Sequence, residues 1–176
     1  MALQDLSGTY VLDPTHSTLS FVTRHAMVTK VRGSFEDFTG TAVLTDDPKL
    51  DVTIQVASVN TRNADRDNHL RSGDFFDVEQ FPTMTFTSTQ YEIKGDVVEI
   101  TGDLTIKDVT KTLTIPFEYQ GEAKDPFGNE RVGFEGSVDV LRSEFGLTWN
   151  AALETGGLLV SDKVKLEFEI SAIKQA

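Results

Sequence analysis

The stretch Lys163-Val164-Lys165-Leu166-Glu167-Phe168-Glu169-Ile170 shows the pattern that decides the fold. Charged and apolar residues alternate at every position, which is the period-2 signature of a β-strand with one wet face and one dry face. Strands of antiparallel sheets commonly cover a core on one side only, so this stretch predicts an antiparallel sheet.

The same alternation recurs along most of the chain. It is clear in residues 19–21, 52–56, 84–87, 98–106, 113–119 and 132–140. A further strand is expected from about Phe35 to Thr45, and short runs near Gly8–Asp13 and Phe145–Leu153 are additional candidates. Turn-forming sequences at 46–48, 94–96, 107–108 and 125–128 separate the runs. The pattern predicts an all-β meander of about eight strands that closes into an antiparallel barrel.

The bulk composition limits the classes of partner. The chain has 176 residues, which suits one domain spanning residues 1–176, and 16 Lys and Arg against 28 Asp and Glu give a net charge of −12. Such a surface repels the phosphates of nucleic acids and anionic lipids, so we expect no nucleic-acid partner. The absence of cysteine excludes disulfides and cysteine-based metal sites.

The sequence also bears on location. The first eight residues contain no basic segment followed by an apolar one, and no apolar run approaches the ~20 residues of a membrane helix. We therefore expect a soluble, cytoplasmic protein without stable membrane insertion. A secreted form whose leader has been removed is the alternative.

Residues 60–76 lack the alternation. Asn63 or Thr61 is a suitable N-cap for a short helix, acidic residues follow in its first turn, and Gly73 is placed just beyond its end. We expect a helical lid over about residues 61–73 between two strands, followed by the apolar pair Phe75-Phe76.

The interior of the barrel is rich in phenylalanine. Twelve Phe stand against one Trp and three Tyr, so the aromatic content is unusually apolar. A filled core and a pocket for an apolar ligand are lined by the same residue types, and periodicity alone leaves both readings open.

Two polar residues continue the inward phase of their strands, His25 after Phe21 and Arg142 after Val140. A buried arginine must be paired, solvated or in contact with a ligand. The sequence is compatible with a salt bridge from Arg142 to a nearby Asp, or with a polar rim around the headgroup of a ligand.

Candidate catalytic groups are few. His16, His25 and His69 could in principle form a zinc site, but their spacing contains no compact ligand pair. Ser17 follows His16 directly, yet the chain has no Gly-x-Ser-x-Gly motif. We therefore expect no catalytic residues, no metal site and no cofactor, and hence a protein that is not an enzyme.

Ordered blocks along nearly the whole chain resemble the YceI-like family of lipocalin-like, polyisoprenoid-binding barrels. They are Tyr10-Val11-Leu12-Asp13-Pro14-Thr15-His16-Ser17 with Phe21 and His25, Gly33-Ser34-Phe35, 66–70, 74–77, Phe81-Pro82, 102–106 and 142–146. The family often has Arg-Gly after the 102–106 block, whereas this chain has Lys107-Asp108, and Asp tolerates a left-handed turn acceptably. Many family members carry a secretion leader, whereas the first residues of this sequence lead us to expect none here.

The resemblance implies an eight-stranded antiparallel barrel with a helical segment over it. It also implies an interior tunnel for the tail of an isoprenoid lipid, such as a polyprenyl quinone or polyprenyl phosphate, and assembly as a homodimer. A filled barrel serving as a protein-interaction or stress-related module without a lipid is the alternative function.

On this reading the inward apolar residues surround the tail, and polar residues near the lid contact the headgroup. The tail-lining candidates are Phe21, Phe35, Phe38, Ile54, Val56, Phe75, Phe76, Phe86, Ile100, Leu104, Phe117, Phe134, Val138, Trp149, Leu166 and Phe168. The headgroup candidates are His25, Arg66, His69 and Arg142. Arg71 is less suitable because Asp67 lies four residues before it and is positioned to pair with it.

Overall fold

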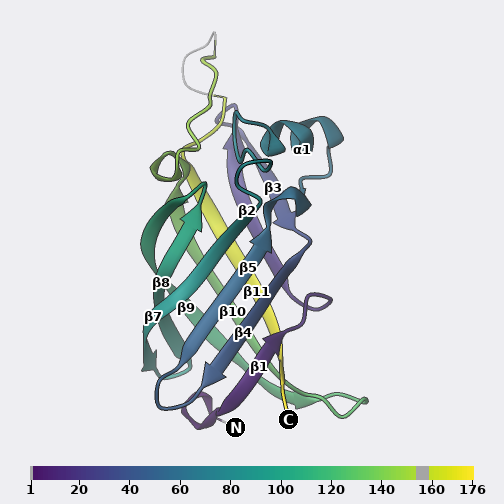
Figure 1. Ribbon diagram of the computed structural model, residues 1–176, viewed down its shortest axis with the longest axis vertical. Coiled ribbons are helices and arrows are strands. Elements are labelled where there is room, and N and C mark those ends of the chain that lie inside the picture. The colour runs from purple at the N-terminus through teal and green to yellow at the C-terminus, as the bar shows by residue number, and fades with distance from the viewer. Residues whose placement is uncertain (1, 154–158) are drawn as a thin grey trace.

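The chain folds into a tall barrel of antiparallel strands with one short α-helix at one end (Figure 1). The computed structural model describes residues 2–153 and 159–176. The strands are β1 (Gly8–Leu12), β2 (Thr18–His25), β3 (Thr29–Phe35), β4 (Phe38–Leu44), β5 (Lys49–Gln55), β6 (Val59–Asn60), β7 (Thr83–Lys94), β8 (Val97–Ile106), β9 (Val109–Lys124), β10 (Glu130–Leu141) and β11 (Lys163–Lys174). Short 3-10 turns cover Leu3–Asp5, Val56–Ser58 and Arg142–Phe145.

Pairing between β1 and β11 closes the sheet. Neighbouring strands follow the order β1-β4-β5-β7-β8-β9-β10-β11, and β11 then pairs with β1, so eight strands complete the circuit. The longest ladder joins β10 to β11 from Arg131 opposite Ile173 to Leu141 opposite Lys163. The expected eight-stranded, lipocalin-like barrel is confirmed.

The first two strands share one partner. β11 pairs with β2 through residues 165–169 and with β1 through residues 172–174, so β1 and β2 lie end to end along it. β3 and β6 extend the sheet beyond β2. The strand expected from about Phe35 to Thr45 is β4, which begins later, at Phe38, because Phe35 is the last residue of β3. The candidate strand at Phe145–Leu153 is absent, because the described chain there forms a 3-10 turn and irregular loop.

The barrel has two different ends, which we call the terminal end and the helix end. Both chain termini and the turns after β4, β7 and β9 lie at the terminal end, at the bottom of Figure 1. The helix end carries α1 (Ala64–Arg71), the turn between β2 and β3, and the segment that follows β10.

The helix α1 is shorter than the expected range of residues 61–73. Asn63 caps it, because its side-chain oxygen accepts a hydrogen bond from the backbone N–H of Arg66 (2.9 Å), which satisfies one exposed donor of the first turn. Ser72 ends it in an extended conformation. The expected pairing of Asp67 with Arg71 is wrong. Asp67 instead accepts hydrogen bonds from the backbone and the hydroxyl of Thr61, at 2.8 and 2.6 Å.

The turn between β8 and β9 explains how Lys107-Asp108 replaces a glycine-containing sequence. Both residues have left-handed backbone angles, with φ of 50° and 64°. Two consecutive left-handed residues match the twist of a two-residue hairpin, and Asp accepts this conformation more readily than most residues. The departure from the family pattern therefore leaves the turn intact.

Candidate functional site

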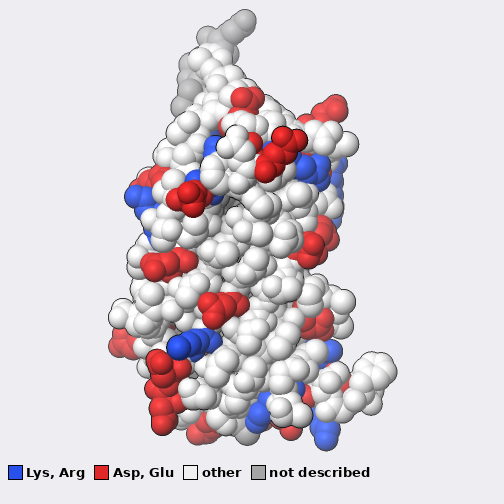
Figure 2. Space-filling model, viewed as in Figure 1, with Lys and Arg blue, Asp and Glu red and all other residues white. Residues whose placement is uncertain are grey.

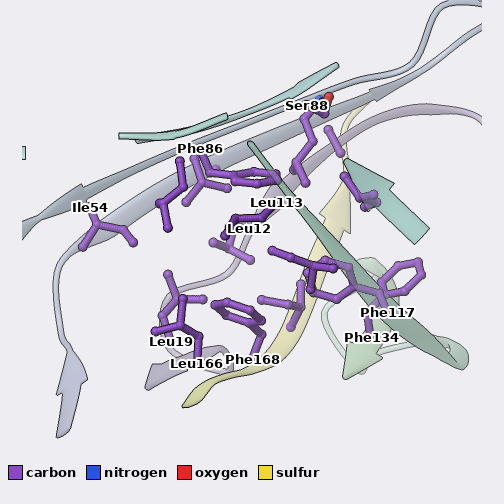
Figure 3. A pocket seen from close by; sticks show the side chains of 18 of the residues that line it. Leu12, Leu19, Ile54, Phe86, Ser88, Leu113, Phe117, Phe134, Leu166 and Phe168 are labelled. Atoms are coloured by element: carbon purple, nitrogen blue, oxygen red, sulfur yellow. Dashed lines mark hydrogen bonds between the residues drawn. The ribbon is translucent and has the colours of Figure 1, made fainter. Parts of the chain in front are cut away.

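The barrel is hollow. Its cavity has a volume of about 440 Å³, within the range of roughly 300–1,000 Å³ that is typical of small-molecule sites. Figure 3 shows side chains from several strands pointing into a shared space, and those drawn are almost entirely hydrocarbon. The inward residues of β11 take part, since Leu166 and Phe168 line the cavity beside Leu19 of the neighbouring strand β2. The interior is therefore suited to an apolar ligand.

Most of the residues assigned to an apolar tail line this cavity. They are Phe21, Phe35, Ile54, Phe75, Phe76, Phe86, Ile100, Leu104, Phe117, Phe134, Leu166 and Phe168. Phe38, Val56, Val138 and Trp149 lie outside its wall. Phe38 and Val56 are buried near the helix end of the barrel. Phe38 pairs with Ile54 and so keeps the inward phase of β4 without reaching the cavity wall, whereas Val56 belongs to a 3-10 turn, where the strand phase ends.

Glycines allow two of the phenylalanine rings to lie flat against the wall. A Cβ atom at Gly33 on β3 would overlap the ring of Phe21 on the paired strand β2. A Cβ at Gly102 would likewise lie 2.5 Å from the ring of Phe86. Because each ring occupies the place of the missing side chain on its neighbour, it does not project toward the barrel axis. This packing helps to keep the interior open.

Arg142 lies inside the barrel at the helix end. Its side chain is only 7% exposed, and it donates hydrogen bonds to the backbone carbonyls of Leu147 (2.6 Å), Ser161 (2.9 Å), Trp149 (3.0 Å) and Val160 (3.3 Å). Burial lowers the pKa of Arg142, and the nearby charge of Asp162 opposes that shift.

The expected salt bridge from Arg142 to an Asp is therefore wrong. The carboxylate of Asp162 accepts from the backbone and the hydroxyl of Ser143 instead. The guanidinium of Arg142 ties the segment after β10 together and seals this end of the cavity.

An aromatic cluster covers Arg142. Its guanidinium carbon lies 5.9 Å from the centroid of the Phe75 ring. His69 of α1 packs edge-on against Trp149 and Phe75, with ring centroids 4.6 and 5.0 Å apart, and its Nε2 lies 2.9 Å from the carboxylate of Asp74. His69 and Trp149 thus form an outer layer over the sealed end.

The other two headgroup candidates lie apart from this cluster. Arg66 donates to the carbonyl and the hydroxyl oxygen of Thr61, at 2.7 and 2.8 Å, and so fastens the start of the helical segment. His25 is exposed at the end of β2, and neither residue lines the cavity. Of the four candidates, only Arg142 contributes to the cavity wall.

The terminal end contributes lining residues that the sequence pattern did not single out. They include Gln4 and Leu6 before β1, Thr45 and Pro48 in the turn after β4, and Gln90, Tyr91 and Ile93 in the last part of β7. Tyr91 and Ile93 are 48% and 37% exposed although they line the cavity. The cavity therefore reaches solvent at this end.

A network of charges ties β1 to the turn between β9 and β10. Arg131 donates to the carboxylates of Asp13 (2.6 Å) and Asp125 (2.7 Å). Burial raises the pKa of Asp13, but hydrogen bonds from Thr15, Arg131 and His16 outweigh it and hold that pKa well below its usual range. The hydrogen bond from Arg131 lowers the pKa of Asp125 to about 2.

The residues considered for catalysis have structural partners. His16 contacts Asp13 through Nδ1 (2.8 Å), whereas the hydroxyl of Ser17 bonds the backbone of Ser171, so the two are not paired as base and nucleophile. Within residues 2–153 and 159–176, no group of three or more His, Asp and Glu side chains is arranged to hold a metal ion. In that same part of the chain, no helix has the length and apolar character needed to span a bilayer.

Comparison with known proteins identifies the family. The YceI-like domain matches residues 10–172, so the chain belongs to the YceI-like family, as the sequence resemblance predicted. A UPF0312 protein of Staphylococcus aureus is 40% identical over 165 residues, which cover 90% of this chain and 93% of the relative.

Two solved structures share the fold. The YCEI protein of Campylobacter jejuni has a TM-score of 0.74 at 34% identity, covering 87% of this chain and 90% of its own. A polyisoprenoid binding domain from Saccharophagus degradans has a TM-score of 0.75 at 17% identity, covering 94% of this chain and 98% of its own.

Proposed function

We propose that this YceI-like protein is a non-catalytic binding and carrier protein for an isoprenoid lipid of the polyprenyl quinone or polyprenyl phosphate type. The observation that carries the proposal is the hollow barrel itself, a cavity of about 440 Å³ walled by aliphatic and phenylalanine side chains. A barrel that served only as a filled scaffold would not need this space.

The similarity to the Saccharophagus degradans domain supports the class of ligand. That protein is named a polyisoprenoid binding domain, and it has the same fold. An isoprenoid tail is branched, flexible and wholly apolar, which fits an interior whose walls offer almost no hydrogen-bonding groups.

The tail supplies the affinity in this proposal. An isoprene unit contains five carbons, and burying each methylene-sized group contributes about 0.8 kcal/mol, so each unit contributes on the order of 3–4 kcal/mol before losses. Ordering of the flexible tail cancels much of this gain. The length of the cavity then limits how many isoprene units are held.

Two polar side chains of the cavity wall, those of Arg142 and Ser88, hydrogen-bond the protein backbone. This supports a binding role without catalysis. Arg142 donates four hydrogen bonds to carbonyl oxygens, and the hydroxyl of Ser88 accepts a hydrogen bond from the backbone N–H of Leu50 (2.8 Å). Neither group is arranged beside a partner that would activate it for nucleophilic or acid–base catalysis.

Identification of the co-purifying lipid tests the proposal. The protein is purified from its native host, extracted with organic solvent, and the extract analysed by mass spectrometry, with native mass spectrometry of the intact complex alongside. We expect one isoprenoid molecule per barrel, and we expect that the protein binds it again after the lipid has been extracted. A protein that neither carries nor accepts any isoprenoid would contradict the proposal.

Cytoplasmic location and assembly as a homodimer remain predictions. Cell fractionation checks the first, and sedimentation equilibrium of the purified protein checks the second. A monomer at all accessible concentrations would contradict the dimer without affecting the ligand.

A further inference from the structure

The terminal end of the cavity has a rim of exposed residues that face inward. Tyr91 and Ile93 pair with Ile100 and Val98, which line the cavity or are buried on its inner face, so Tyr91 and Ile93 belong to the same inward phase. Their exposure shows that solvent reaches the inner face of the sheet at this point. The other exposed large hydrophobic residues among those described do not line the cavity.

The cavity is open at this end because the last part of β7 extends beyond the residues that pair with β5. The β5–β7 ladder ends where Asp51 lies opposite Thr87, whereas β7 continues to Lys94. At the end of the ladder, the side chain of Ser88 takes the place of a backbone acceptor for Leu50. Beyond the end of the ladder, the last part of β7 and the turn after β4 lie on either side of a gap, and residues of both segments line the cavity.

A β-bulge sets which residues face this gap. The pairing of β7 with β8 shifts between Ser88 and Gln90, so one extra residue, Thr89, is inserted. Phe86 and Ser88 point inward before the bulge, and Tyr91 and Ile93 point inward after it. The bulge therefore brings a phenol and an aliphatic side chain to the rim.

The rim offers neutral hydrogen-bonding groups. It contains the amides of Gln4 and Gln90 and the hydroxyl of Tyr91. The hydroxyls of Thr45 and Ser88 are also there, and they already bond the backbone of Asp47 and Leu50. Amides and hydroxyls both donate and accept hydrogen bonds, so they match the carbonyl oxygens of a quinone or the hydroxyl of an alcohol.

The charges at the rim disfavour an anionic headgroup. Its only cation among the described lining residues is Lys49, whose Nζ lies 3.9 Å from the carboxylate of Asp47, and Asp46 is adjacent. Arg142, the other cation of the cavity wall, lies at the sealed end and donates four hydrogen bonds to backbone carbonyls. Figure 2 shows acidic and basic side chains interspersed over this face, including its lower end, without a concentrated basic patch. A diphosphate needs arginine forks or several cations, which this rim lacks.

We propose that the gap between the turn after β4 and the last part of β7 is the headgroup site, and that it selects a neutral, hydrogen-bonding head over a diphosphate. The inference rests on the proposed isoprenoid-binding function and specifies which end holds the head and which chemistry it accepts. The tail then extends toward Arg142 and Phe75.

Ligands with one tail and different heads test the selection. The delipidated protein is titrated by calorimetry with a prenyl alcohol, a prenyl quinone and a prenyl diphosphate that carry the same number of isoprene units. We expect the neutral heads to bind roughly tenfold or more tightly than the diphosphate, equivalent to about 1.4 kcal/mol. Equal or tighter binding of the diphosphate would overturn the inference while leaving the isoprenoid function intact. Failure of all three to bind would overturn the function itself.

A charge-removing variant sharpens the test. In the double variant Asp46→Asn/Asp47→Asn, we expect the affinity for the diphosphate to rise roughly three- to tenfold, because two exposed repulsions of modest size are removed, and the affinity for the alcohol to stay unchanged. The matched control, Asp65→Asn/Asp108→Asn, removes the same charge from the helix end. A similar gain in the control would mean that only the net charge matters, and would count against the site.

A photoreactive headgroup tests the position directly. A prenyl alcohol with a diazirine beside its hydroxyl is bound, illuminated, and the labelled peptides are mapped by mass spectrometry. We expect labels on residues 45–49 and 88–93. Labels on residues 61–76 instead would place the head at the helix end and contradict the proposal.

Discussion

The two ends of the barrel differ in how far solvent reaches the residues that line the cavity. At the helix end, the side chain of Arg142 is buried and gathers four carbonyl oxygens, and Phe145 beside it is almost completely inaccessible. At the terminal end, Tyr91 and Ile93 face the same cavity and are open to solvent. The helical segment carries several arginines, yet the end it covers is the closed one. The helical segment therefore covers the buried end of the cavity, and the exposed lining residues Tyr91 and Ile93 lie at the other end.

The largest expected effect comes from opening the sealed end. The Arg142→Met variant removes the donors of four carbonyl oxygens in a buried site, so we expect the free energy of unfolding to fall by about 3–5 kcal/mol. Urea denaturation, followed by the fluorescence of Trp149, measures it. The control Arg32→Met removes an exposed ion pair to Glu167 and should cost less than about 1 kcal/mol. A stable Arg142→Met protein with altered headgroup preference would instead make Arg142 a ligand contact.

The second effect concerns the charge network of the terminal end and depends on pH. The pKa of Asp125 is about 2 and that of Asp13 is lower than usual, whereas unfolded aspartates titrate near 3.9. The stabilisation from both carboxylates is therefore complete above about pH 4 and is lost as the pH falls through the folded-state values.

In the Arg131→Met variant, we expect lower stability at pH 7 and a flatter decline between about pH 5 and pH 2 than in the wild type. Denaturant titrations across this pH range check it. Parallel curves for the two proteins would show that Arg131 does not set the two pKa values.

The third effect concerns the shape of the cavity between the two ends. In the Gly33→Ala variant, the new methyl group displaces the ring of Phe21 toward the barrel axis. We expect ligand affinity to fall roughly five- to thirtyfold, as for an overpacked core that costs about 1–2 kcal/mol. Calorimetry with a prenyl alcohol measures it. In the control Gly133→Ala, the nearest atom to the new Cβ is at 3.5 Å, so affinity should be unchanged.

The smallest effect on stability is expected at the open rim. The Ile93→Ser variant changes an exposed side chain, so the free energy of unfolding should change by no more than about 0.5 kcal/mol. Ligand binding should nevertheless weaken, because the apolar rim beside the headgroup is lost. A large loss of stability would show that this end is packed rather than open.

The period-2 alternation in the sequence correctly predicted the regular strands and the side chains on their inward faces. Alternation in residues 163–170 identified β11 and its inward face, and the inward phase of β10 correctly placed Arg142 inside the barrel. Asn63 was one of the two predicted helix caps, with Thr61, because capping chemistry is local, and the structure shows that Asn63 is the cap. These features depend on spacing within one segment, which a sequence displays directly.

The features that the sequence did not reveal depend on contacts between distant segments. The carbonyls that engage Arg142 come from an irregular loop without a period, so an aspartate was the expected partner. The opening arises because β5 stops before β7 does, and neither strand's sequence encodes the other's length. The bulge at Thr89 lies in a run of Ser, Thr and Gln without glycine, so it left no recognisable signal.

The bulge at Thr89 makes the rim sensitive to the length of β7. A single inserted residue in β7 determines which side chains reach the rim, while the strand before it keeps its phase. Deleting Thr89 would turn Tyr91 and Ile93 outward and bring their sequence neighbours to the opening, without changing any other strand. The chemistry of the entrance is therefore governed by the count of residues in one strand as much as by their identity, and a one-codon deletion could retune it in a single evolutionary step.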